Sequence, residues 1–185
     1  GASLGQMVDR RLMGSGSEPV EVGRMDRFHL MGASEGAAIP KVWGRVRLAG
    51  QVIWASPFRE IAQTSTSGGR GKGGGGAGQA SVTQYSYRVS LALGLCEGEI
   101  LGIGRVWADG TEVAPQSLNL RLYRGDDSQL PDPLIEAHEG ASAAPAYRGL
   151  AYVVIDDLDL SPYGSRVPQF SFEVLRRAAS ETLEG

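Results

Sequence analysis

Hydrophobic and polar positions alternate along much of the chain, and this alternation is the pattern of β-strands. The clearest run covers residues 83–95, where Thr83 and then apolar or aromatic side chains occupy every second position, and mostly polar residues lie between them. A period of two is typical of a strand with one buried face. At about 3.3 Å for each residue the run spans roughly 43 Å, which is long enough to bend or to serve two sheets. The residues expected on its buried face are Thr83, Tyr85, Tyr87, Val89, Leu91, Leu93 and Leu95.

Shorter runs predict further strands on both sides of this one. Ala49-Gly50 separates two of them with the sequence of a hairpin turn, and Asp109-Gly110 marks a second tight turn. A short helix is expected at 131–139, because proline is tolerated in the first turn of a helix. We predict a mainly β barrel or sandwich, formed as one β domain or as two packed β subdomains, with one short helical insertion. The shorter strands are expected at 42–48, 51–55, 100–108, 111–113, 118–123, 151–155 and 169–174, and residues 59–66 either extend the strand at 51–55 or form a further one.

The chain divides into three parts by composition. Residues 1–27 combine a short helix, indicated by Leu4, Val8 and Leu12 at helical spacing, with a linker rich in Gly, Ser and Pro at 14–22. Residues 28–176 are expected to form the β-rich domain, and residues 177–185 a frayed tail. Because the first residue is Gly1 and not methionine, we expect the chain to be cut from a longer protein.

Glycine is the compositional outlier, at 27 of 185 residues, and eight of these glycines lie between positions 68 and 78. They belong to a long loop at 67–80, whose length adds little to the entropic cost of closing it. A phosphate-binding loop is rejected, because that motif requires Gly-Lys-Ser/Thr and here Gly73 follows Lys72. The loop is instead our candidate interface with an acidic partner, through Arg70, Gly71, Lys72 and Gly73.

The net charge and the counts of cysteine and histidine exclude several classes of function. The 18 basic and 21 acidic residues give a formal net charge of −3, which argues against nucleic-acid recognition. The single cysteine excludes an internal disulfide framework and a cysteine-based zinc site, and two histidines leave little for a histidine-based one. No stretch reaches the length of about 18 apolar residues that a membrane span needs. We therefore assign no metal, no cofactor and no membrane span.

No pattern in the sequence identifies a catalytic residue. The carboxylates of Asp156, Asp157 and Asp159 either hold a cation or form a solvated strand end. Cys96 is expected to be a buried small hydrophobe, and His138 an exposed polar residue. A hydrolase needs two carboxylates that face each other. The sequence does not single out such a pair among Glu97, Glu99 and Asp109.

The large aromatic and basic residues of the strands are expected to have structural roles. The tryptophans lie within strand patterns, so core packing is favoured over interface anchoring. The arginines are expected on solvated faces or beside acidic neighbours. These residues are Trp43, Trp54 and Trp107, and Arg45, Arg47, Arg105 and Arg148.

Five blocks, in order, resemble the large baseplate proteins of gene transfer agents and related long-tailed phages, often described as tail or host-specificity proteins with a TIM-barrel-like central region. The first block covers residues 34–47 and 50–55. The second, GLCEGEI with VWADG, is similar to the family's "CEG…WADG" strand pair. The remaining blocks are PDPLIE at 131–136, AYRGLAYVV at 146–154 and PQFSFEV at 168–174. The resemblance covers residues 28–176.

This resemblance implies an N-terminal hub domain of a far longer protein. Such hubs form a homotrimer at the tail tip and adapt the six-fold tail tube and distal tail ring to the three-fold tip. The implied partners are other copies of the chain, the distal tail protein ring and neighbouring tail-tip proteins. The implied location is the tail tip of a virion or phage-like particle assembled in the bacterial cytoplasm. No catalytic residue is carried over from the family.

Two rival functions stay open at this point. A carbohydrate- or receptor-binding β-module of the same particle would need exposed aromatic side chains at a shallow site. A wall-degrading hydrolase would need a pocket with paired carboxylates.

Overall fold

The computed structural model describes residues 20–22, 38–67 and 80–178, and it confirms a mainly β fold with two sheets. The chain divides into two compact units. The larger unit comprises Met25–Glu60 and Tyr87–Gly185, and the smaller one comprises Gly1–Arg24 and Ile61–Ser86. The expected helix at residues 1–13 and most of the glycine-rich loop lie outside the described residues.

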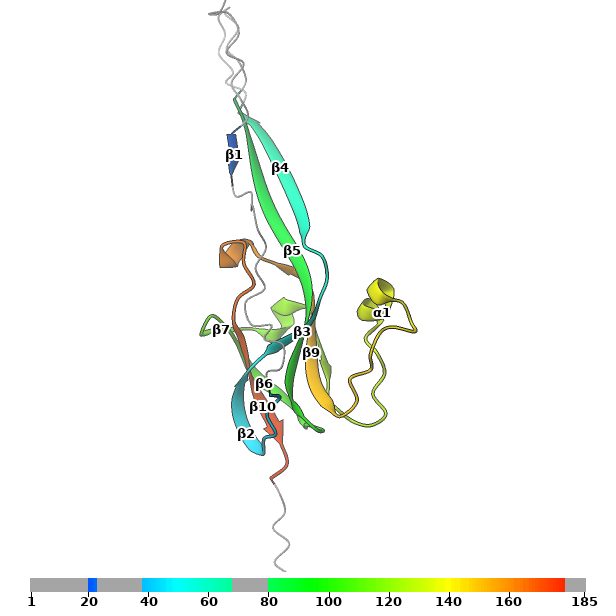
Figure 1. Cartoon of the computed structure of the whole chain (residues 1–185). Helices are drawn as coiled ribbons and strands as arrows, with labels where there is room; N and C mark the ends of the chain where they lie inside the picture. Colours follow the sequence, from blue (N-terminus) through cyan, green and yellow to red (C-terminus); the bar gives the residue numbers. More distant parts are fainter. Residues whose placement is uncertain (1–19, 23–37, 68–79, 179–185) are drawn as a thin grey trace, which may run out of the picture. The chain divides into compact units, whose positions relative to one another are not determined.

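One sheet has four strands in the order β2-β10-β6-β7 and belongs to the larger unit (Figure 1). All three pairings in it are antiparallel. Alternate residues of its central strand β10 are buried, so one face of this sheet packs on the core. The strands are β2 (Gly44–Ala49), β6 (Gly102–Ala108), β7 (Thr111–Val113) and β10 (Phe170–Arg176).

The other sheet has six strands built around β5 (Ala80–Glu97), which contains the long strand predicted at 83–95. The strands β1, β3, β4 and β9 pair with β5, and β8 pairs with the outer edge of β9. Two register shifts in the β5–β9 pairing mark bulges that interrupt this pairing. These other strands are β1 (Val20–Val22), β3 (Gln51–Ala55), β4 (Arg59–Ser67), β8 (Leu120–Tyr123) and β9 (Leu150–Asp159).

The core of the larger unit extends to both faces of β5. The expected inner face is buried from Tyr87 to Leu95, whereas its first residues, Thr83 and Tyr85, are only half-buried. On the opposite face, Ala92 is buried as well. A second layer covers that face, where the helix α1 (Pro133–Glu139) places Ile135 against Ala92, Tyr152 and Val154. The region of β5 with one polar face therefore ends at Ser90.

The predicted hairpin at Ala49-Gly50 is wrong, although both strands beside it exist. β2 pairs with β10 in the four-stranded sheet, whereas β3 pairs with β5 in the six-stranded one. Gly50 is therefore a crossing between sheets, and its amide donates to the carbonyl of Phe170 at 3.0 Å. A Cβ atom at Gly50 would lie 3.0 Å from the Phe172 ring and 3.2 Å from Leu93, so only glycine fits without displacing the core.

The other turn and the helix agree with the sequence. Asp109 and Gly110 have φ values of 48° and 81°, as a two-residue hairpin between β6 and β7 requires. Asp132 caps α1 by accepting from the Leu134 amide, and Pro133 occupies the first helical position.

Some elements were not predicted. Within the expected linker, the residues Val20–Val22 instead form a strand parallel to β5. Two short 3-10 helices were not predicted, at Pro115–Leu118 and Ser161–Tyr163.

Candidate functional site

The candidate interface loop at Arg70, Gly71, Lys72 and Gly73 lies outside the described residues, so it stays a prediction. The described part of the larger unit contains other candidates, which are a carboxylate cluster with an adjoining pocket, a buried ion pair and an arginine-rich sheet face. No helix in the described part is long and apolar enough to cross a membrane.

The carboxylates at the end of β9 are held by arginines. Asp157 accepts from Arg59 and Arg88, each at 2.7 Å, and Arg88 also lies 3.8 Å from Asp159. Burial alone would raise the pKa of Asp157, but the hydrogen bonds from Arg88 and Arg59 outweigh it and hold this pKa below its ordinary value. The described residues contain no group of three potential ligands placed to bind a metal. Of the two interpretations of this cluster, the arginine contacts favour the strand end, with its carboxylates paired to arginines.

A β-bulge in β9 orients the side chain of Asp157 toward Arg59 and Arg88. Its φ of 53° lies in the left-handed region, and its amide donates to the Ser90 hydroxyl, which in turn donates to Asp156. The register shift between Val89 and Leu91 occurs at this point. Bulges often redirect a side chain in this way. As a result, the carboxylate of Asp157 reaches the two arginines.

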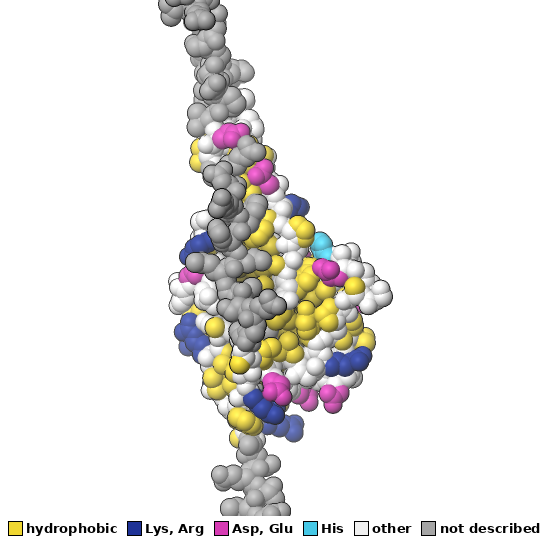
Figure 2. Space-filling model, viewed as in Figure 1, with side chains coloured by type: hydrophobic (Ala, Val, Ile, Leu, Met, Phe, Trp, Pro, Cys, Tyr) yellow, Lys and Arg dark blue, Asp and Glu magenta, His cyan; other side chains and the backbone are white. Residues whose placement is uncertain are grey.

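An open pocket of about 420 Å³ adjoins this cluster in the larger unit. Its lining combines apolar side chains with Arg59, Arg88, Asp156 and Asp157. His138 also borders the pocket and is exposed, as predicted, at a surface where hydrophobic side chains gather (Figure 2). A glycosidase acid needs a raised pKa, whereas that of Asp157 is lowered, so Asp157 does not match such an acid.

A buried ion pair fastens α1 to the sheet, and the sequence analysis missed it. The carboxylate of Asp132 is 0% exposed and accepts from Arg121 at 2.8 and 3.0 Å and from the Tyr123 hydroxyl at 2.7 Å. Burial alone would raise the pKa of Asp132. The hydrogen bonds from Arg121, Tyr123 and the Leu134 amide lower this pKa by more than burial raises it, so the net shift is downward. The Asp-Pro pair is a helix-start signal that marks Asp132 in the sequence.

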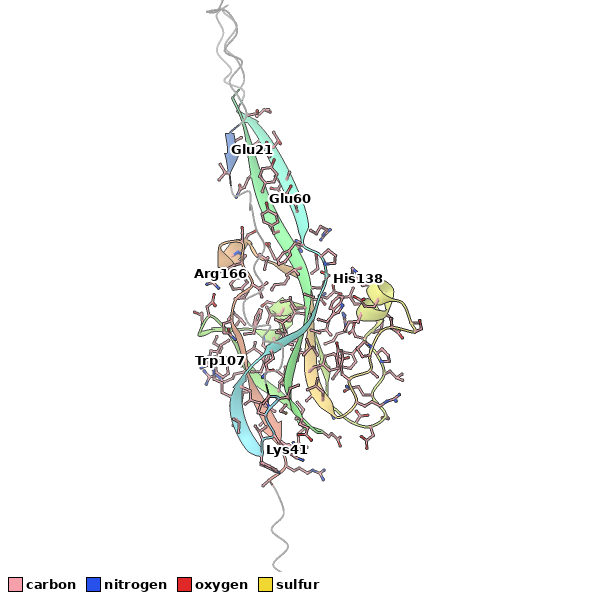
Figure 3. The ribbon with its side chains drawn as sticks, viewed as in Figure 1. Glu21, Lys41, Glu60, Trp107, His138 and Arg166 are labelled. Atoms are coloured by element: carbon pink, nitrogen blue, oxygen red, sulfur yellow. The ribbon has the colours of Figure 1, made fainter. Side chains whose placement is uncertain are left out.

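The outward face of the four-stranded sheet carries a stack of arginines on tryptophan. Trp107, which is labelled in Figure 3, is almost fully buried. The Arg47 guanidinium lies 4.0 Å and that of Arg105 lies 5.0 Å from its ring centroid. Arg105 also pairs with Glu112. Such cation–π contacts attract a guanidinium to the ring face. This face therefore presents arginine side chains beside a covered indole ring.

The remaining predicted residues have mixed outcomes. Trp43 is 50% exposed, which contradicts its expected place in the core, and Trp54 is half-buried with its indole N–H donating to Glu139 at 2.8 Å. Cys96 is buried as predicted, and burial raises the pKa of its thiol. The other predicted arginines and acids have these partners: Arg45 with Glu173, Arg148 with the Gln129 carbonyl, Glu97 with Lys41, and Asp109 with Arg166.

Comparison with known proteins gives one informative similarity. No protein-family model matches the chain, and no curated protein matches it. A solved structure described as the virion of a native gene transfer agent particle contains a chain 54% identical to this one, with a TM-score of 0.62. The match covers 91% of this chain and 33% of that chain, so the present sequence spans about a third of the virion chain's length. The expected resemblance is thus confirmed at the level of the particle: the chain is similar to part of a gene transfer agent virion component.

Proposed function

We propose that this chain is a structural hub domain of a phage-like tail baseplate. It forms a homotrimer at the tail tip and adapts the six-fold tail tube and distal tail ring to the three-fold tip. The observation that carries the proposal is the 54% identity, over 91% of the chain, to a component of a gene transfer agent virion. The order of the resembling sequence blocks supports the more specific assignment to the hub of the baseplate protein.

The side-chain chemistry of the larger unit supports a structural, non-catalytic role. Its acidic residues are used in fixed contacts, such as Asp132 with Arg121 and Asp157 with Arg59 and Arg88. Side chains held in this way lose less entropy when a partner binds, which favours a preorganised contact surface. Arg70 and Lys72 in the glycine-rich loop remain our proposed contact with an acidic partner.

The solution mass of the chain tests this proposal. The purified chain would be measured by size-exclusion chromatography with light scattering, alone and mixed with the distal tail protein of the same gene cluster. We expect a trimer, or a monomer that binds the ring in three copies. A chain that stays monomeric and does not bind the ring would overturn the hub assignment.

A second candidate function is glycan or receptor binding within the same particle. The observations that favour it are the pocket of about 420 Å³ and the exposed indole of Trp43. Aromatic and charged groups together are suited to a polar ligand with apolar faces. A glycan array followed by titration calorimetry tests it. Binding that weakens in Leu134→Ala, at the pocket wall, and survives in Trp43→Ala would favour this function and place the ligand in the pocket.

A further inference from the structure

The smaller unit contains a three-stranded sheet in the order β1-β5-β4. β1 runs parallel to β5, with Glu21 opposite Thr83 and Val22 opposite Gln84. β4 runs antiparallel to β5. Their hydrogen bonds join residue 65 to 82, 64 to 83 and 61 to 86, so the number rises along one strand as it falls along the other. These registers fix which side chains share a face of the sheet.

The two faces of this sheet differ in character. One face carries polar cross-strand contacts, since the hydroxyl oxygens of Thr64 and Thr83 lie 2.9 Å apart and Tyr85 donates to Glu21 at 3.1 Å. Strand alternation places the intervening residues on the opposite face. We call this opposite face the valine face, formed by Val22, Ile61 and Val82 with Gln63, Ser65 and Gln84.

The valine face carries exposed hydrophobic side chains on two neighbouring strands, where Val22 lies opposite Gln84 and so diagonally across from Val82. Val22 is 48% and Val82 is 40% exposed, although both are large hydrophobic side chains. The buried hydrophobic residues of the described chain begin at Tyr87, so the described strands of the smaller unit contribute none to a core. A sheet of so few strands needs a covered hydrophobic face for stability. These exposed side chains make the valine face the candidate contact surface of this sheet.

The valine face also lacks formal charge. Glu21 is the single charged residue among the described residues of the smaller unit, and it lies on the opposite face. At a rotational symmetry axis each side chain meets its own copy, so a charge there would face a like charge. A neutral, apolar surface avoids this repulsion. A charged partner, in contrast, would find no complementary group on this face.

We propose that the valine face packs against the valine faces of other copies of the chain and forms the self-association contact. This inference rests on the proposed trimeric hub and names the surface that holds the trimer together. Each copy buries Val22, Ile61 and Val82 about the symmetry axis. The occupant of the face is thus a second and a third copy of this chain, and not the tail ring or a glycan.

A matched pair of lysine variants tests the proposal in the full 185-residue chain. Val82→Lys puts a cation on the valine face, and Thr64→Lys puts the same cation at an exposed position on the opposite face of the same sheet. Like charges at the axis weaken self-association by about tenfold or more in Val82→Lys. Thr64→Lys is expected to associate as the unchanged chain does. Circular dichroism and thermal melting of both variants confirm that the larger unit stays folded.

Cysteine crosslinking gives a second readout that does not depend on weakening the assembly. Val82→Cys is expected to form disulfide-linked dimers on mild oxidation, and Thr64→Cys is expected to form none. The native Cys96 is buried and does not interfere. Association and crosslinking that are equal in both pairs would overturn the valine-face inference while leaving the trimeric hub standing. An unchanged chain that stays monomeric even on the tail ring would overturn the hub and this inference with it.

Discussion

Two stacked tyrosines of the larger unit offer a sharp test, because the same substitution is expected to have opposite effects on them. The rings of Tyr123 and Tyr152 lie 4.4 Å apart and within 5° of parallel. The hydroxyl of Tyr123 donates to buried Asp132, whereas the hydroxyl of Tyr152, which is 0% exposed, has no hydrogen-bond partner in the described part of the chain. Replacing each with phenylalanine removes one hydroxyl and leaves the stack.

The expected free energies follow from these contacts. Tyr123→Phe loses a hydrogen bond to a charged group, which is worth about 1.5–3 kcal/mol, and Asp132 keeps its arginine. Tyr152→Phe removes a buried unpaired hydroxyl, whose burial costs about 1–3 kcal/mol, so this variant is expected to gain about 1 kcal/mol. The free energies of unfolding of the two variants should therefore differ by at least about 2.5 kcal/mol.

Urea denaturation followed by tryptophan fluorescence measures both variants against the unchanged chain. An unchanged slope with denaturant shows that each substitution acts on stability alone. A loss of more than about 1 kcal/mol in Tyr152→Phe would refute the reasoning, because it would mean that this hydroxyl is hydrogen-bonded in the folded protein. A Tyr123→Phe variant that loses no stability would refute the assigned role of Asp132 as the acceptor.

Three further predictions concern the core and its ionisable groups. Gly50→Ala is expected to cost about 1–3 kcal/mol by overpacking against Phe172, whereas Gly102→Ala, with open space around its Cβ, stays within about 0.5 kcal/mol of the unchanged chain in the same urea assay. The pKa of Asp132 is lowered in the folded state, so the ionised carboxylate stabilises the fold above its unfolded pKa of about 4. This stabilisation is lost as the pH falls through the folded pKa. In Asp132→Asn, the free energy of unfolding should therefore fall less steeply at acid pH. The buried Cys96 thiol, whose pKa is raised, should resist a thiol reagent until urea unfolds the chain, and rapid labelling without urea would contradict its burial.

The sequence predicts the strands well because their signal is local. Alternation along 83–95 and the turn at Asp109-Gly110 depend on neighbouring residues, and both agree with the structure. The predicted hairpin at Ala49-Gly50 was wrong, because these two residues carry no information on which sheet the next strand joins. The long-range pairing of β2 with β10 and of β3 with β5 decides it.

The candidate site was less predictable because its contacts are long-range. Arg88 and Asp157 lie far apart in the sequence, and only the pairing of β5 with β9 brings them together. For the Arg121–Asp132 pair, the sequence does indicate one partner, because the Asp-Pro step marks Asp132 as the start of a helix. The continuous apolar run at 91–96 also indicates a strand buried on both faces, which is what the structure has.

The crossing at Gly50 has a mechanical consequence. A single residue joins the last position of β2 to the first of β3, and one residue reaches about 3.3–3.6 Å at full extension. The two sheets are thus tied with almost no slack, and the amide of Gly50 adds a tether to Phe170. A pull on β2 therefore passes directly to β3 and β5. Force on one layer of this molecule is carried by both, so the layers cannot slide past each other at this point without first breaking strand pairing.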